Sequence, residues 1–108
     1  MLDTWHFFRG RPDYDALRSF ADLVAGIQLN DAPRDPTADL PTETLTARLL
    51  PGDGDFDLMK VLDVLHEADA RPSIGVEVFS TALQQLDPLE VGRRAGDATR
   101  AVLRDAVG

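Results

Sequence analysis

Three oxygen-bearing side chains, Asp3, Gln28 and Glu77, stand in or next to short apolar stretches of this chain. Gln28 and Glu77 share a local pattern, because each follows a glycine by two positions, Gly26 and Gly75. A carboxylate among apolar neighbours needs a partner, since burying an unpaired charge is very costly. Carboxylate and amide oxygens are the ligands that hard divalent cations such as Mg²⁺ and Mn²⁺ prefer. The pattern therefore predicts a metal site, with a structural ion pair or an exposed sheet face as the alternative.

Three predicted strands place these side chains: residues 1–4, 24–29 and 73–79. The second and third are rich in β-branched or large aliphatic residues, which favours strands. Side chains along a strand point alternately to opposite faces. We expect the aliphatic faces to lie against helices, with Ala25, Ile27 and Leu29 from the second strand and Ile74, Val76 and Val78 from the third. Gln28 and Glu77 then share the opposite face.

Apolar residues at helix spacing follow each strand and predict three helices. The stripes are Tyr14, Leu17, Phe20 and Ala21, then Leu58, Val61, Leu62, Leu65 and Ala68, then Val91, Ala95, Ala98 and Val102. Three strands alternating with three helices predict an α/β fold with parallel strands covered by helices. The remaining long segment, from about Asn30 to Gly54, is expected to be irregular, on the side where α/β proteins place their chemistry.

Local signals mark where these helices begin. Pro12 suits the first turn of the first helix, and Asp55 or Asp57 is the expected N-cap of the second. The third helix has the strongest signal, because Asp87 as N-cap is followed by Pro88 at the first helical position.

Composition limits the classes of function. The chain has 108 residues, enough for one small domain, and no cysteine, which excludes disulfides and thiolate metal sites. Its 11 basic and 19 acidic residues give a net charge of −8, which disfavours a nucleic-acid partner. The sequence contains no apolar run near the roughly 20 residues that span a bilayer. Neither does it show a secretory signal, so we expect a cytoplasmic protein without a membrane partner.

Four segments, in this order and spacing, resemble the xylose-isomerase-like TIM barrels: residues 3–6 (DTWH), 27–31 (IQLND), 48–54 (RLLPGDG) and 76–79 (VEVF). That family includes sugar and sugar-phosphate isomerases and epimerases, inosose and dehydroshikimate dehydratases, and apurinic-site endonucleases. The resemblance implies that residues 1–108 are the C-terminal part of such a barrel, its last three strand–helix units with strands 6–8. A complete (β/α)₈ barrel takes about 250 residues, so the domain is expected to be incomplete.

The resemblance also implies a ligand set. Asp3, Gln28 and Glu77 match metal-binding positions on the last three strands, and Glu77 doubles as a catalytic acid or base. A fourth ligand, a Glu from strand five, would precede Met1. The implied cofactor is a divalent cation, with Mn²⁺, Mg²⁺ and Co²⁺ as the expected choices.

Four further residues match positions at which members of the family contact substrate. His6 and Arg48 are implied to bind substrate oxygens, and a guanidinium suits carboxylate, phosphate or a developing enediolate. Arg48 has the alternative of being an ordinary surface arginine. Trp5 and Phe79 are expected either to form an apolar wall for a sugar ring or to serve in packing.

The implied function is a metal-dependent sugar or sugar-phosphate isomerase or epimerase that removes a proton next to a carbonyl through a metal-stabilised enediolate. One alternative is a lyase of the dehydroshikimate or inosose dehydratase type, which Gln28 favours. Another is a non-catalytic remnant. The apurinic-site endonucleases are rejected, because they need His at the position of Gln28 and Asp-x-His where this chain has Thr46-Ala47-Arg48. The expected partners are a small sugar, cyclic polyol or keto-acid, and either a second copy or the missing barrel part, since three parallel strands leave open edges.

Overall fold

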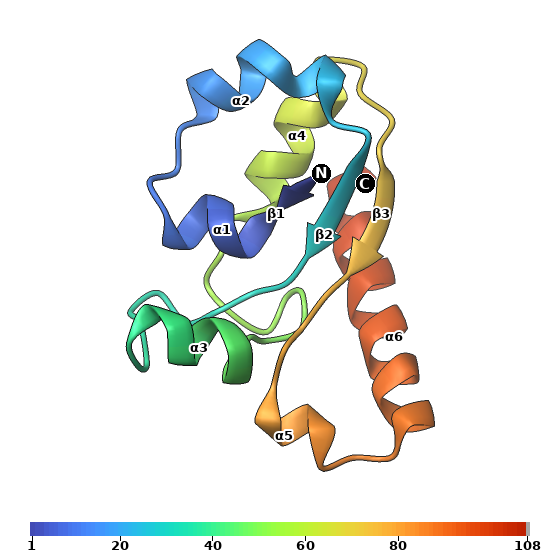
Figure 1. Cartoon of the computed structure of the whole chain (residues 1–108). Coiled ribbons are helices and arrows are strands. Elements are labelled where there is room, and N and C mark those ends of the chain that lie inside the picture. Colours follow the sequence, from blue (N-terminus) through green and yellow to red (C-terminus); the bar gives the residue numbers. More distant parts are fainter. Residues whose placement is uncertain (108) are drawn as a thin grey trace.

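The computed structural model describes residues 1–107, and its centre is a parallel sheet of three strands (Figure 1). β2 (Gly26–Leu29) lies in the middle, between β1 (Leu2–Asp3) and β3 (Ser73–Val76). Asp3 is in register with Gln28 on one side, and Leu29 is in register with Val76 on the other. The predicted α/β fold with parallel strands is therefore confirmed. Within residues 1–107 the sheet is not closed, because β1 and β3 each pair on one side only.

The helices fall into two groups (Figure 1). One group accompanies the sheet: α1 (Thr4–Arg9), α2 (Tyr14–Phe20) with the 3₁₀ turn η1 (Ala21–Leu23), α4 (Leu58–Glu67) and α6 (Pro88–Val107). The other group, α3 (Leu40–Thr46) and α5 (Thr81–Gln84), lies beyond the arrowheads of β2 and β3 in Figure 1, at the carboxyl ends of the strands.

The hydrophobic core joins one face of β2 to α2, α4 and α6. Ile27 and Leu29 are buried, as the alternation along the strand predicts, but Ala25, which was expected on the same face, is exposed because β2 begins only at Gly26. They share a cluster with Leu17 and Ala21, with Val24, with four residues of α4 (Leu58, Val61, Val64 and Leu65), and with Val102 of α6. Complete burial of a large aliphatic side chain contributes about 1.5–3 kcal/mol, so this cluster is the main support of the sheet. Gln28 is left on the opposite face.

Aspartates begin most of the helices by accepting hydrogen bonds from free backbone N–H groups of the first turn. Asp57 caps α4 through the N–H of Lys60, which selects it over Asp55. Asp87 accepts from the N–H of Leu89 at the start of α6, where Pro88 is the first residue as predicted. Pro12 lies before α2 rather than in its first turn, because Asp13 is the N-cap.

Three expectations about element boundaries were wrong. The residues predicted as irregular, 30–54, contain α3, which has no apolar stripe because Leu40 and Leu45 are both exposed. Thr4 belongs to α1 rather than to the first strand, since the Asp3 carboxylate caps the N–H of Trp5 and turns the chain into a helix. β2 and β3 are also shorter than predicted, at Gly26–Leu29 and Ser73–Val76.

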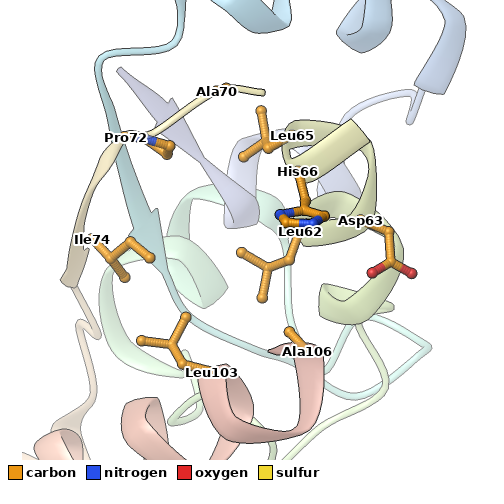
Figure 2. Close-up of a pocket in the computed structure, with 9 residues that line it drawn as sticks. All are labelled: Leu62, Asp63, Leu65, His66, Ala70, Pro72, Ile74, Leu103 and Ala106. Atoms are coloured by element: carbon orange, nitrogen blue, oxygen red, sulfur yellow. The ribbon is translucent and has the colours of Figure 1, made fainter. Parts of the chain in front are cut away.

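The aliphatic face of β3 is less well covered than predicted. Ile74 is 41% exposed and Val76 is 36% exposed, although both were expected against helices. Ile74 does face the helical layer, where it lines a hollow of about 210 Å³ with Leu62 of α4 and Leu103 of α6 (Figure 2). The helices therefore cover β3 incompletely.

No helix among residues 1–107 combines the length and the apolar character needed to cross a membrane.

Candidate metal and substrate site

Asp3 ends β1, and most of its side chain is shielded from solvent. Its Oδ1 accepts hydrogen bonds from the backbone N–H of Trp5 at 2.8 Å and from the side-chain amide of Asn30 at 2.8 Å. Its Oδ2 accepts from Nη1 of Arg48 at 3.3 Å. Every one of these donors lies near the carboxyl end of a strand or in a loop that follows one, so the carboxylate is held at that edge of the sheet.

Asn30 joins the ends of the three strands. Its amide nitrogen donates to Asp3 and also to the backbone carbonyl of Glu77 at 3.3 Å, so one side chain bridges β1 and β3. Its own position is fixed by Thr4, whose hydroxyl donates to Asn30 Oδ1 at 2.8 Å and accepts from the Asn30 backbone N–H at 3.1 Å. Thr4 and Asn30 are both fully buried.

Gln28 and Glu77 are hydrogen-bonded to each other, with Nε2 of Gln28 donating to Oε2 of Glu77. Their proximity follows from the sheet, because Gln28 is in register with Gly75 and side chains two residues apart share a face. Among the described residues, no donor reaches Oε1 of Gln28 or Oε1 of Glu77. One oxygen of each side chain is thus left for another ligand.

We call Asp3, Gln28, Asn30, Arg48 and Glu77 the strand-end cluster. No group of three His, Cys, Asp or Glu side chains within residues 1–107 could hold a metal ion alone. The strand-end cluster instead combines two carboxylates with an amide, and carboxylate and amide oxygens are suited to hard divalent cations. A carboxylate oxygen has two lone pairs, so Asp3 can ligate while it accepts from Arg48. The chemistry of this donor set suits a divalent cation, and Asp3, Gln28 and Glu77 are the residues that would hold it.

Arg48 is an internal residue of the cluster rather than a surface arginine, with 2% of its surface exposed. Its Nε donates to the backbone carbonyl of Thr44 at 2.8 Å, and its Nη1 donates to Asp3. The guanidinium carbon lies 5.2 Å from the ring centre of Trp5 and 4.7 Å from that of Phe79. No acceptor for Nη2 is found among the described residues, so this nitrogen is available to an oxygen of a bound molecule.

The other predicted substrate contacts differ in exposure. His6 is open to solvent and its Nε2 lies 3.9 Å from Oδ2 of Asp3. Phe79 is 39% exposed and covers Arg48 from the β3 side. Trp5 has no exposed surface and donates its indole N–H to the Thr44 hydroxyl at 2.9 Å. Its burial favours the packing alternative, with Trp5 as the support beneath Arg48.

Asp31 organises the loop that follows Arg48. Its carboxylate accepts backbone hydrogen bonds from Ala32, Gly52 and Phe56, each at 2.9 Å. Burial raises the pKa of Asp31 above its usual value, and the backbone N–H groups lower it by less. Gly52 has φ +91°, and a Cβ on Gly54 would stand 2.4 Å from the Ala32 carbonyl, so both glycines set the shape of the loop.

A second buried charge pair adjoins the cluster. Arg9, at the end of α1, donates from Nε to Oε1 of Glu43 at 2.8 Å and from Nη2 to Oε2 at 3.0 Å. Glu43 is completely buried on α3. Burial acts to raise the pKa of Glu43, but hydrogen bonds from Arg9 and Thr37 together with the Arg9 charge outweigh it, and the pKa is lowered.

Sequence reasoning did not single out Asn30, Thr4, Arg9 or Glu43. Asn30 and Thr4 lie within the family-like segments, two positions after Gln28 and one after Asp3, so their places at strand ends were the available signal. Arg9 and Glu43 are 34 residues apart in sequence. No spacing rule pairs residues that distant, and only the fold brings them together.

The chain is similar to known proteins both in family and in fold. A family model described as xylose isomerase-like TIM barrel matches residues 1–103. A crystal structure of the IolI protein with a bound zinc atom superposes with a TM-score of 0.86 at 24% sequence identity. The match covers 97% of this chain but 37% of that one, and at this identity the likeness concerns the fold alone. A search of curated proteins finds no match.

Proposed function

The chain belongs to the xylose isomerase-like TIM barrel family, and from this premise we propose that its strand-end cluster is part of a metal-dependent sugar isomerase or epimerase site. One observation carries the proposal: Asp3, Gln28 and Glu77 share one face at the carboxyl ends of three adjacent parallel strands. That edge is where α/β barrels place their catalytic groups. The bound zinc of the IolI structure supports a divalent cation in a protein of this fold.

In the proposed reaction a proton is removed next to a carbonyl and returned to the neighbouring or the same carbon. A bound divalent cation would supply positive charge at the oxygens on which negative charge develops. Asp3, Gln28 and Glu77 would hold that cation. Glu77 is the proposed acid or base, and the Gln28 amide, which donates to Oε2 of Glu77, would orient this carboxylate beside the cation.

Arg48 is the proposed substrate-binding group. Nε and Nη1 are engaged by Thr44 and Asp3, so the plane of the guanidinium is fixed before a substrate arrives. Nη2 then donates to a substrate oxygen from a site shielded by Trp5 and Phe79, where a charged hydrogen bond is stronger than in water. His6, exposed beside Asp3, is proposed to contact a second substrate oxygen.

We propose that residues 1–108 work as the C-terminal part of a barrel, joined to the remaining strands in the same chain or in another. The open edges of the sheet and the 37% coverage of the IolI chain support this. The lyase alternative uses the same proton abstraction, followed by loss of a hydroxyl. Gln28 is the feature of the sequence that favours it.

The experiment uses the protein purified in the form that its cells contain, with any chain that accompanies it. Mn²⁺ binding is measured by isothermal titration calorimetry, and turnover is measured with D-xylose, an inosose and 3-dehydroshikimate. We expect one Mn²⁺ site per chain, abolished in E77Q, and isomerisation or epimerisation of a sugar. Dehydration of the inosose or of 3-dehydroshikimate would support the lyase, whereas Mn²⁺ binding unaffected by D3N, Q28A and E77Q would contradict the proposed site.

A further inference from the structure

The Arg9–Glu43 pair is more elaborate than a stabilising contact between two helices requires. Besides binding Glu43 through two nitrogens, Arg9 donates from Nη2 to the Pro33 carbonyl at 2.7 Å. Oε2 of Glu43 also accepts from the backbone N–H of Thr37 at 2.9 Å and from its hydroxyl at 3.2 Å. The pair therefore ties three separate segments together: the end of α1, the loop at Pro33–Thr37, and α3.

α3 is also the element that fixes Arg48. Thr44 is the residue after Glu43. Its backbone carbonyl accepts a hydrogen bond from Nε of Arg48, and its hydroxyl accepts one from the indole N–H of Trp5. Trp5 lies in contact with both arginines, since the guanidinium carbons of Arg9 and Arg48 are each 5.2 Å from its ring centre. A shift of α3 would therefore displace the groups that hold Arg48.

The charges of the two arginines are separately neutralised. Arg9 has Glu43 as its carboxylate, and Arg48 has Asp3. Both guanidinium groups lie over the indole ring of Trp5, and each is paired with its own carboxylate.

We propose that Glu43 and Arg9 are positioning residues, which hold α3 so that the Thr44 carbonyl and the Trp5 ring fix the guanidinium of Arg48 for substrate. This inference rests on the proposed function only for the role of Arg48 in binding substrate. The orientation of Arg48 by the pair follows from the contacts described above and can be measured without turnover.

The test measures hydrogen exchange at the side-chain Nε–H of Arg48 by ¹⁵N NMR, with its resonance assigned by its loss in R48K. E43Q keeps the shape of Glu43 and removes its charge, and R9K keeps the charge of Arg9 and removes its fork of donors. We expect the exchange rate of the Arg48 Nε–H to rise by at least about tenfold in both variants, because its local structure opens more often. If E43Q does not fold, R9K decides.

A matched control is available on α6, where Arg94 and Glu90 form an exposed ion pair. E90Q makes the same chemical change and should leave the Arg48 exchange rate within about twofold of the unchanged protein. T44V is a second comparison, since it removes the hydroxyl that binds Trp5 but retains the carbonyl that binds Arg48. An Arg48 exchange rate that is unchanged in folded R9K would overturn the proposal.

Kinetics separate the two levels of inference. For whichever substrate of the panel turns over, E43Q and R9K should raise KM by about tenfold and change kcat by less than about threefold, as loss of uniform binding does. Faster Arg48 exchange without turnover of any panel substrate would support the positioning role and count against the proposed function. Turnover with KM and exchange both unchanged in the variants would reject the positioning role and leave the proposed function intact.

Discussion

The carboxyl end of the sheet and the flank formed by β3, α4 and α6 are built in contrasting ways. At the carboxyl end, charged and polar side chains are buried, yet among the described residues every side-chain nitrogen or oxygen that is fully shielded from solvent has a hydrogen-bond partner. Along the flank most of the side chains are apolar, but they are only partly covered around the hollow of about 210 Å³. The polar side chains at the carboxyl end are thus more completely packed than the apolar side chains of this flank.

This contrast indicates which region needs more protein to complete it. The strand-end cluster is connected within the chain, since Asn30 and Arg48 both donate to Asp3 and Gln28 donates to Glu77. β3 is different, because parallel strands are usually covered on both faces and Ile74 and Val76 are substantially exposed. The difference supports the proposal that further barrel elements pack beside β3, while the cluster's own geometry is already formed.

The largest expected effect comes from breaking the buried charge pair. R9M leaves the Glu43 carboxylate buried without its counter-charge, and we expect a loss of about 3–5 kcal/mol in the free energy of unfolding at pH 7, measured by urea denaturation. The double variant R9M/E43M removes both charges and should recover most of that loss, because Thr37 is exposed and can bond to water. Equal losses in the single and double variants would show that packing, not charge, matters at this place.

The next effect compares the apolar regions directly. Leu17 is completely buried beneath β2, so L17A should cost about 3 kcal/mol through lost burial and a new cavity. I74A, on the incompletely covered flank, should lower the free energy of unfolding by about 1 kcal/mol. Both free energies are measured by urea denaturation of the protein in its cellular form. If I74A costs as much as L17A there, another segment covers the flank in that form.

The sequence was sufficient to predict much of the hydrophobic core but not the polar contacts at the carboxyl end of the sheet. Alternation along β2 predicted the burial of Ile27 and Leu29, and the capping signals located the start of α6 at Asp87 and limited that of α4 to Asp55 or Asp57. It missed α3, because a helix whose leucines are exposed has no apolar stripe to detect. The proximity of Gln28 and Glu77 followed from strand order and period, whereas the Arg9–Glu43 pair depends on a loop conformation that no local rule predicts.

The effect of pH should distinguish the two buried carboxylates at the carboxyl end. The pKa of Glu43 is lowered, so the stability it contributes is complete above its ordinary value of 4.5 and is lost as the pH falls through its pKa in the folded protein. The difference in unfolding free energy between the unchanged protein and E43Q should therefore shrink as the pH is lowered below 4.5. A difference that stays constant from pH 7 to pH 3 would contradict the ion pair.

Asp31 provides the control with the opposite sign. Its pKa is raised above 3.8 by burial, so the folded protein binds this proton more tightly than the unfolded chain does. Its contribution to stability therefore falls as the pH rises from below 3.8 through its pKa in the folded protein. D31N should abolish this fall. It should not change how the loss of unfolding free energy caused by E43Q depends on pH.

The smallest effect is expected at the exposed pair on α6. Nη2 of Arg94 lies 2.7 Å from Oε1 of Glu90, but both side chains remain open to solvent. E90Q should change the free energy of unfolding by less than about 0.5 kcal/mol, because water screens the attraction and ordering two long side chains opposes it. The measurement is the same urea denaturation at pH 7, repeated at higher salt. A loss comparable with that of R9M would mean that ion pairs matter equally in both regions, and burial would then not explain why the carboxyl end of the sheet differs from its flank.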